Sequence, residues 1–173
     1  WRSKDGVHWS EPQAVADKGY WLWRLTEHQD ALYGVGYRAG PDGDTRFYKS
    51  DDGQLFKPWM PVFNDQGYVN ESSLVFHQGS CFCLLRRDPV WSDEFLGLLG
   101  HSLPPFKQWT WQTLDKRIGG PVLFVYQSRL MAVVRLYEGN IRTALIEINQ
   151  ETGAIHERLT LPSQGDTSYA GIV

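Results

Sequence analysis

Several residues able to bind or cleave a sugar recur along the chain at nearly constant spacing. The positions that repeat, at steps of 47, 49 and 47 residues, are Arg24, Glu71, Gly120 and Thr167. Asp166 and Tyr169 flank the last of them. Arginine binds carboxylates through paired hydrogen bonds, and glycoside hydrolysis needs a carboxylic acid and a second group at the anomeric carbon. These residue types suit a polyhydroxylated, anionic ligand, provided that the fold brings the positions together.

The elements that must position these residues are short strands in a repeat of about 47 residues. Runs rich in β-branched and aromatic residues, separated by turn residues, indicate an all-β fold. A unit of this length with four such runs is typical of a β-propeller blade. We expect one unit, 1–173, with three complete four-stranded antiparallel blades and two partial flanking blades. The complete blades are expected at about 21–63, 71–115 and 120–162, and the partial ones at 1–16 and 166–173.

In a propeller the first strand of each blade lines the central channel, and ligands bind at one mouth of it. Arg24, Glu71 and Asp166 are therefore predicted to lie close together around that mouth, with Asn70 beside Glu71. An inward-facing arginine or glutamate can instead pair across the channel and hold neighbouring blades together. Both interpretations of Arg24 and Glu71 stay open at this point.

A short motif, Ser-x-Asp-Gly-x-x-aromatic, occurs as "SKDGVHW" from Ser3 and as "SDDGQLF" from Ser50. Ser3, Asp5 and His8 could form a nucleophilic site. A motif repeated once per blade more naturally forms the turn between outer strands, where serine and aspartate hydrogen-bond to amides and glycine adopts positive φ. The motif resembles the Asp box (BNR repeat) of sialidases and related propeller glycosidases, in a form one residue shorter.

Two further stretches extend this resemblance. "WRLT" (23–26) is similar to the first-strand segment whose arginine binds the sialic acid carboxylate, and "TSYAGIV" (167–173) to the segment with the nucleophilic tyrosine. The resemblance implies a fragment of a five- or six-bladed ring from a secreted or periplasmic parent, although no signal is visible. It also implies an exo-glycosidase that cleaves a terminal, acidic sugar. The alternative is a non-catalytic glycan- or protein-binding propeller.

The resemblance also implies roles for individual residues. Tyr169 would be the nucleophile, Glu71 the base that activates it and Asp166 a further acid/base group. Arg24 would bind the sugar carboxylate, with Asn70 also contacting the ligand.

An arginine recurs near the end of the second strand of each unit, at Arg38, Arg86 and Arg135. Arg86 and Arg135 are predicted to bind substrate, by comparison with the sialidase arginine triad. The alternative is that these arginines form hydrogen bonds between blades.

The composition of the chain limits which partners are expected. The net charge of −3 over 173 residues comes with no basic run, so no nucleic-acid partner is expected. No apolar stretch is long enough to span a membrane, and no histidine or cysteine has metal-ligand spacing, so neither metal nor cofactor is expected. Cys81 and Cys83 are interpreted as buried free thiols. The expected partners are a carbohydrate and, through open blade edges, a second copy of the chain.

Overall fold

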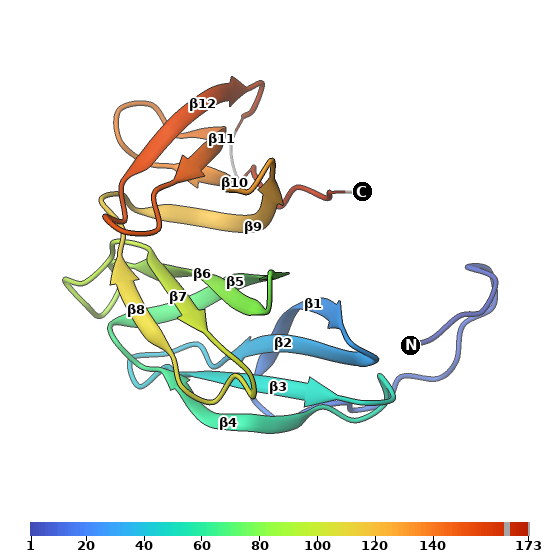
Figure 1. The fold of residues 1–173 in the computed structure, drawn as a ribbon. Helices are drawn as coiled ribbons and strands as arrows, with labels where there is room; N and C mark the ends of the chain where they lie inside the picture. Colours follow the sequence, from blue (N-terminus) through green and yellow to red (C-terminus); the bar gives the residue numbers. More distant parts are fainter. Residues whose placement is uncertain (165–166, 173) are drawn as a thin grey trace.

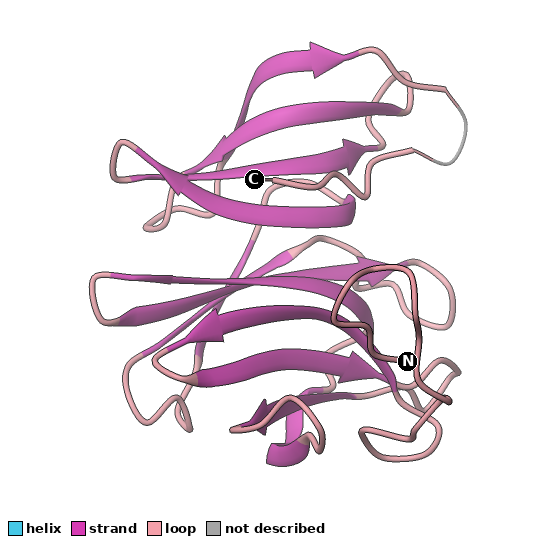
Figure 2. Cartoon of the chain, turned by 90° about the vertical axis from the view of Figure 1, so that its right-hand side faces the viewer, coloured by secondary structure: helices cyan, strands magenta, loops and turns pink. Residues whose placement is uncertain are grey.

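A computed structural model describes residues 1–164 and 167–172, and the described chain consists of strands and loops without helices (Figures 1 and 2). The strands are β1 (Trp21–His28), β2 (Ala31–Tyr37), β3 (Thr45–Ser50), β4 (Lys57–Asn64), β5 (Tyr68–His77), β6 (Ser80–Asp88), β7 (Leu98–Ser102), β8 (Thr110–Thr113), β9 (Ile118–Tyr126), β10 (Arg129–Leu136), β11 (Arg142–Ile148) and β12 (Ile155–Leu161).

These strands form three four-stranded antiparallel sheets, each made of four consecutive strands paired in chain order. The three predicted four-stranded units are therefore confirmed. In Figure 1 the sheet β5–β8 lies between the sheets β1–β4 and β9–β12. The first strands of neighbouring sheets contact each other, β1 with β5 and β5 with β9. This arrangement brings β1, β5 and β9 to the same side of the stack.

Apolar side chains fill the two spaces between the sheets. One cluster joins the first two sheets and includes Phe47, Phe63 and Cys83, while the other joins the last two and includes Leu84 and Ile146. Alternation of side chains along β6 explains this, because Cys83 and Leu84 point to opposite faces of the middle sheet. Cys81 and Cys83 are buried free thiols, as predicted. Burial raises the pKa of Cys83 well above its ordinary value.

The structure differs from the sequence prediction at several boundaries. No strand is present in residues 1–20 or 167–172, where partial blades were expected. A strand needs a partner to complete its hydrogen bonds, and neither segment pairs with a strand among the described residues. In Figure 1 the N-terminal segment extends away from the sheets. The three sheets form an open stack. Self-association of two chains through the edges of this stack stays a prediction.

A further difference concerns the third strand of the second unit, which the apolar pattern predicts to begin at 94, whereas β7 begins at Leu98. The residues before it turn toward Arg87 instead of pairing with β6. The guanidinium of Arg87 donates to the Leu96 carbonyl at 2.6 Å and pairs with the Glu94 carboxylate at 3.0 Å. This buried arginine thus draws four residues out of the expected strand.

The two copies of the serine motif make equivalent hydrogen bonds. The Ser3 hydroxyl accepts from the Gly6 amide at 2.7 Å, and the Ser50 hydroxyl accepts from the Gly53 amide at 3.0 Å. In each copy the aspartate accepts from the two amides that follow the glycine. The motif therefore forms a turn. Ser50 itself is buried at the end of β3.

This difference in burial between the two serines gives a stability prediction. Ser50→Ala should lower the free energy of unfolding by about 1 kcal/mol, because the partly buried Gly53 amide loses its partner. Ser3→Ala makes the same chemical change in the N-terminal segment outside the sheets and should leave global stability unchanged. Urea unfolding followed by tryptophan fluorescence measures both. Equal losses in the two variants would contradict the distinction.

Candidate functional site

A β-bulge occurs at the corresponding point of β1, β5 and β9. Two residues of the first strand face one residue of the second strand, and these pairs are Trp23–Arg24, Asn70–Glu71 and Gly120–Pro121. Bulges reorient side chains and are common beside functional sites. The sequence repeat that aligned Arg24, Glu71 and Gly120 therefore corresponds to a repeated backbone feature.

The carboxylate of Glu71 is the centre of the contacts at these bulges. Its Oε2 accepts from Arg86 Nη1 at 2.6 Å and from the Gly120 amide at 3.0 Å. Its Oε1 accepts from the Tyr169 hydroxyl at 3.2 Å. Only 7% of Glu71 is exposed. One buried carboxylate thus joins the second sheet, the third sheet and the C-terminal segment.

Arg86 lies opposite the Asn70–Glu71 bulge and carries a second ion pair. Its Nη2 is 2.9 Å from Oδ2 of Asp88. The same Oδ2 accepts a hydrogen bond from the side-chain nitrogen of Asn70, Nδ2, at 3.1 Å. Burial alone would lower the pKa of Arg86, but the hydrogen bond and charge of Glu71, together with Asp88, hold that pKa above its ordinary value. Arg86 therefore stays cationic and bridges two carboxylates.

Asn70, a predicted ligand-binding residue, has an internal role as well. Its side-chain oxygen accepts from the Glu71 amide at 2.8 Å, which fixes the backbone of the bulge. Asp88 extends the network by an ion pair with Arg117, whose guanidinium lies over the Tyr137 ring at 3.8 Å.

The C-terminal segment crosses this network. Ser168 and Tyr169 both have positive φ, at 97° and 52°, a costly backbone conformation for non-glycine residues that is frequent at functional sites. Gly120 also has positive φ, and a Cβ there would lie 2.2 Å from the Ser168 hydroxyl oxygen. The glycine allows the segment to approach β9 closely. The segment thus covers Gly120.

Arg24 contacts the same segment from the first sheet. Its Nη2 donates to the Ala170 carbonyl at 2.9 Å, while its buried Nε makes no hydrogen bond within the described residues. Burial lowers the pKa of Arg24, and the charge of Glu71 opposes that shift. Arg24 and Glu71 therefore both contact the C-terminal segment, whereas their place at the mouth of a central channel stays a prediction. Asp166, the third residue of that prediction, lies outside the described residues.

The three recurring arginines do not act alike. Arg135 donates to the Thr167 carbonyl and lies 5.5 Å from the Tyr169 ring centroid, so it joins the site through the C-terminal segment. Arg38 is half exposed beyond the end of β2 and pairs with Asp44 at 3.2 Å. The series thus places Arg86 and Arg135 at the site and Arg38 outside it.

Aromatic rings surround the Tyr169 side chain, which is 38% exposed. Trp23 meets its ring edge-on at 5.9 Å, and Trp23, Tyr37 and the exposed Trp21 contact one another. Burial, with a further contribution from Glu71, raises the pKa of Tyr37 to about 12. Tyr37 is therefore a neutral phenol at the site.

Sequence analysis did not identify Asp88, Arg117 or Tyr37 as site residues. Each lies at or beyond the end of a strand, and none shares the phase of the repeat that singled out Glu71. The tripeptide Arg86–Arg87–Asp88 offered one signal, because adjacent opposite charges in an apolar strand require internal partners.

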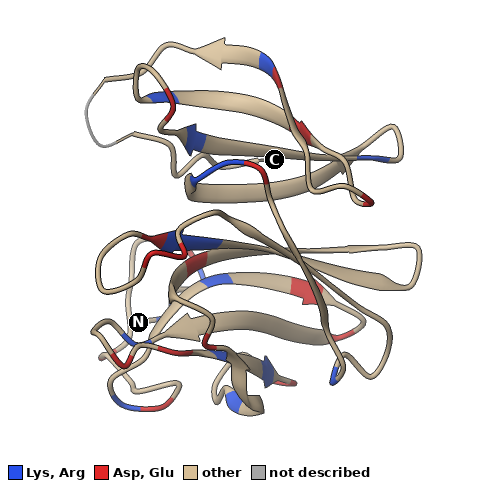
Figure 3. Ribbon diagram, turned by 90° about the vertical axis from the view of Figure 1, so that its left-hand side faces the viewer, with Lys and Arg blue, Asp and Glu red and all other residues tan. Residues whose placement is uncertain are grey.

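The described residues contain no group of three or more His, Cys, Asp or Glu side chains able to hold a metal ion. They also contain no helix that could cross a membrane. Figure 3 shows acidic and basic residues interspersed over all three sheets.

Comparison with known proteins places the fold among propeller glycoside hydrolases. No protein-family model and no curated protein matches the chain. The GH32 β-fructofuranosidase BmSUC1 of Bombyx mori is similar (TM-score 0.57, 15% identity, 82% of this chain and 37% of that one). GH43B from the xyloglucan locus of Bacteroides ovatus is also similar (TM-score 0.63, 14% identity, 89% and 32%).

A protein of unknown function from Dyadobacter fermentans gives a TM-score of 0.64 at 10% identity, with 87% of this chain and 57% of that one covered. At these identities the likeness shows the fold alone. The chain spans about a third to somewhat over half of these three structures. The fold supports a general resemblance to propeller glycoside hydrolases and does not distinguish sialidases among them.

The largely buried Arg86 and the half-exposed Arg38 allow a matched test of the ion-pair network around Glu71. Arg86→Met should destabilise the chain by about 3–5 kcal/mol, because two buried carboxylates lose their shared cation. Arg38→Met removes an exposed pair and should cost less than about 1 kcal/mol. Urea unfolding measures the loss of unfolding free energy in both variants. The loss in Arg86→Lys should be intermediate between those of Arg86→Met and Arg38→Met. Similar losses for Arg86→Met and Arg38→Met would show that the network is not the stabilising element.

Proposed function

We propose that this chain is part of a glycoside hydrolase that cleaves a terminal, acidic sugar, with Tyr169 as nucleophile and Glu71 as its base. The contact between the Tyr169 hydroxyl and Glu71 Oε1, 3.2 Å long, is the observation that carries the proposal. A base within hydrogen-bond reach of a nucleophile is the arrangement that nucleophilic catalysis requires. Similarity of fold to a GH32 β-fructofuranosidase and a GH43 enzyme supports it.

In the proposed reaction, the Tyr169 oxygen forms a bond to the anomeric carbon as its proton passes to Glu71 Oε1. The bond from the anomeric carbon to the leaving oxygen breaks, and that oxygen takes a proton from a general acid. Water then attacks the anomeric carbon, gives a proton to that acid's conjugate base and releases the sugar, while Tyr169 recovers its proton from Glu71. Asp166 is the predicted acid. A neutral phenol suits an anionic sugar, because a carboxylate nucleophile would be repelled by it.

Two guanidinium groups support the choice of an acidic sugar. Arg24 makes one hydrogen bond to a carbonyl within the described residues, which leaves donors for a ligand carboxylate. Arg135 lies beside the Tyr169 ring. In this proposal Arg24 is the principal anchor. Arg86 and Asn70 position Glu71, a change from the direct substrate contacts that we first expected.

A non-catalytic glycan-binding propeller is the second candidate. Two observations favour it. Ser168 and Tyr169 cover Gly120 of β9, and Glu71 Oε2 is occupied by structural partners, as a purely architectural carboxylate would be. The arginine and aromatic groups of the site would then hold a sugar without cleaving it.

Substitutions of the central pair separate the two candidates. We expect Glu71→Gln to lower kcat for a fluorogenic sialoside by about 10²–10⁴-fold, and Tyr169→Phe to abolish turnover. Both variants should retain binding of N-acetylneuraminic acid, whereas Arg24→Met should weaken that binding. Tyr126→Phe, an exposed tyrosine at the far end of β9, is the matched control.

The measurements use the 173-residue chain, a panel of fluorogenic glycosides and calorimetric titration. Undiminished turnover in Glu71→Gln and Tyr169→Phe would contradict the assigned roles. Sugar binding without turnover in every sample would support the non-catalytic alternative. Sedimentation of the same samples reports whether the open stack associates with a second copy.

A further inference from the structure

The C-terminal segment is held to the sheets in two different ways along its length. Its first half, residues 167–169, is anchored by several contacts. The Thr167 carbonyl accepts from Arg135 Nε at 2.9 Å. The Tyr169 hydroxyl donates to Glu71 Oε1 at 3.2 Å. Side chains of the second and third sheets therefore fix this half in place.

The second half, residues 170–172, makes one hydrogen bond with the described part of the chain. Its donor is Arg24 Nη2, which lies 2.9 Å from the Ala170 carbonyl oxygen. Ile172 is 49% exposed, and a Cβ added at Gly171 would meet no atom within 4 Å. Arg24 is therefore the polar attachment of this half to the sheets.

This attachment satisfies the Arg24 guanidinium incompletely. Nε and Nη2 lie on one side of the group and form a fork that fits the two oxygens of a carboxylate. Ala170 supplies a single oxygen at Nη2, while Nε is buried and has no acceptor among the described residues. A buried donor without an acceptor costs free energy. A carboxylate in the place of the carbonyl would pair with both nitrogens and carry the opposite charge.

The residue before Arg24 has the same deficiency. The indole nitrogen of Trp23 is buried without an acceptor in the part of the chain that the structure describes, and its ring meets that of Tyr169 edge-on. Two adjacent residues at the β1 bulge thus hold donors that are shielded from solvent and unsatisfied. A ligand that pairs with the Arg24 fork must displace the group already there, which is the Ala170 carbonyl.

We propose that residues 170–172 act as a displaceable plug. The Ala170 carbonyl occupies the Arg24 fork until the carboxylate of a ligand replaces it, while Tyr169 keeps its hydrogen bond to Glu71. This inference rests on the proposed function for the identity of the ligand, an acidic sugar. A ligand shifts such an equilibrium only through its different interactions with the two states. The carboxylate gains a charge pairing and a second hydrogen bond that the carbonyl cannot provide, and a neutral sugar gains neither. The plug therefore favours acidic ligands by competition.

The attachment of the plug is tested without any ligand. A nitroxide spin label on Ile172→Cys of the 173-residue chain reports its mobility. The native cysteines are buried, so the label reacts at the new thiol. Arg24→Met should abolish the immobilised component of the spectrum, because residues 170–172 lose their hydrogen bond. Arg38→Met, outside the site, should leave that component unchanged.

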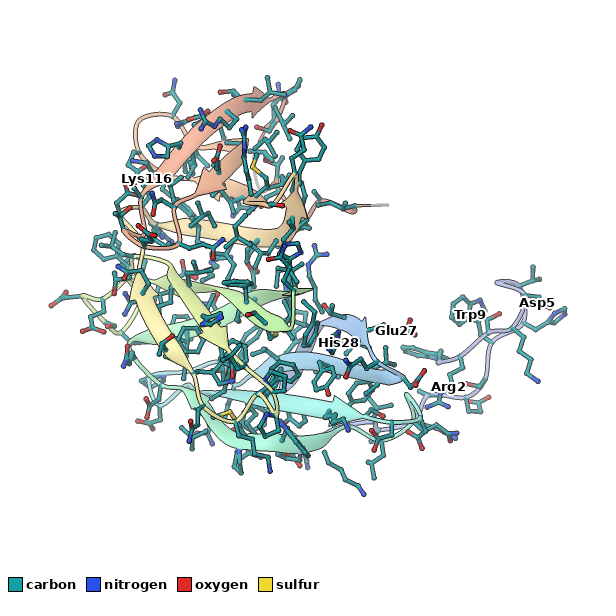
Figure 4. The ribbon with its side chains drawn as sticks, viewed as in Figure 1. Arg2, Asp5, Trp9, Glu27, His28 and Lys116 are labelled. Carbon is teal, nitrogen blue, oxygen red and sulfur yellow. The ribbon has the colours of Figure 1, made fainter. Side chains whose placement is uncertain are left out.

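A second label position controls for general loosening of the chain. Trp9 is 62% exposed and lies on the N-terminal segment away from the sheets (Figure 4). A label on Trp9→Cys should give the same spectrum with Arg24 and with Arg24→Met. Thermal melting of each labelled variant confirms that it is folded.

Displacement is tested with two sugars on the chain labelled at Ile172→Cys. N-acetylneuraminic acid should abolish the immobilised component, with a midpoint equal to the dissociation constant from isothermal titration calorimetry. N-acetylmannosamine, which is neutral, should leave the spectrum unchanged at the same concentrations.

The outcomes separate the plug from the proposed function. An immobilised label in Arg24→Met would overturn the plug whatever the sugars do. Binding of the acid with the label still immobilised would overturn displacement alone and leave the proposed function standing. Release in Arg24→Met without any binding of the acid would overturn displacement and the acidic-sugar function together. Release by N-acetylmannosamine would overturn the selection of acids.

Discussion

The ion pair between Glu71 and Arg86 is the interaction on which the geometry of the site depends. A carboxylate with 7% exposure loses most of its hydration, and such a group is tolerated only with close and complete pairing. Glu71 meets that requirement with donors from three parts of the chain: Arg86, the Gly120 amide and Tyr169. The need to satisfy one buried charge thus fixes the second sheet, the third sheet and the C-terminal segment relative to one another.

The repeated bulge explains why this charge lies where it does. In a regular strand, neighbouring residues point to opposite faces, so Asn70 and Glu71 could not both turn toward the same network. A bulge lets two residues oppose one, which allows Asn70 to hold Asp88 and the Glu71 amide while Glu71 pairs with Arg86. The corresponding bulge in β9 contains Gly120, whose positive φ directs an amide toward the same carboxylate. The backbone irregularity is therefore part of the site.

Sequence reasoning predicted the sheets well because their pattern is local. Alternating apolar runs and turn residues specified all three four-stranded units, and the repeat placed Arg24 and Glu71 at equivalent bulges. It failed where charged side chains outside the apolar pattern decide the structure. The expected strand from 94 was shortened by Arg87, and Asp88 gained its role from Arg117, 29 residues away. The partial blades were not observed because a strand pattern forms no ladder without a partner strand.

The two oxygens of Glu71 serve separate purposes, and this reconciles its architectural and chemical interpretations. Oε2 receives both structural donors, so the orientation of the carboxylate is set without the participation of Oε1. Oε1 can then accept the hydrogen bond from the Tyr169 hydroxyl. Tyr169 itself remains 38% exposed. A base held by other contacts needs little reorganisation during proton transfer, which is the basis of electrostatic preorganisation. The cross-strand contacts of Glu71 therefore place a potential base in position, and a structural role for this residue is no argument against a catalytic one.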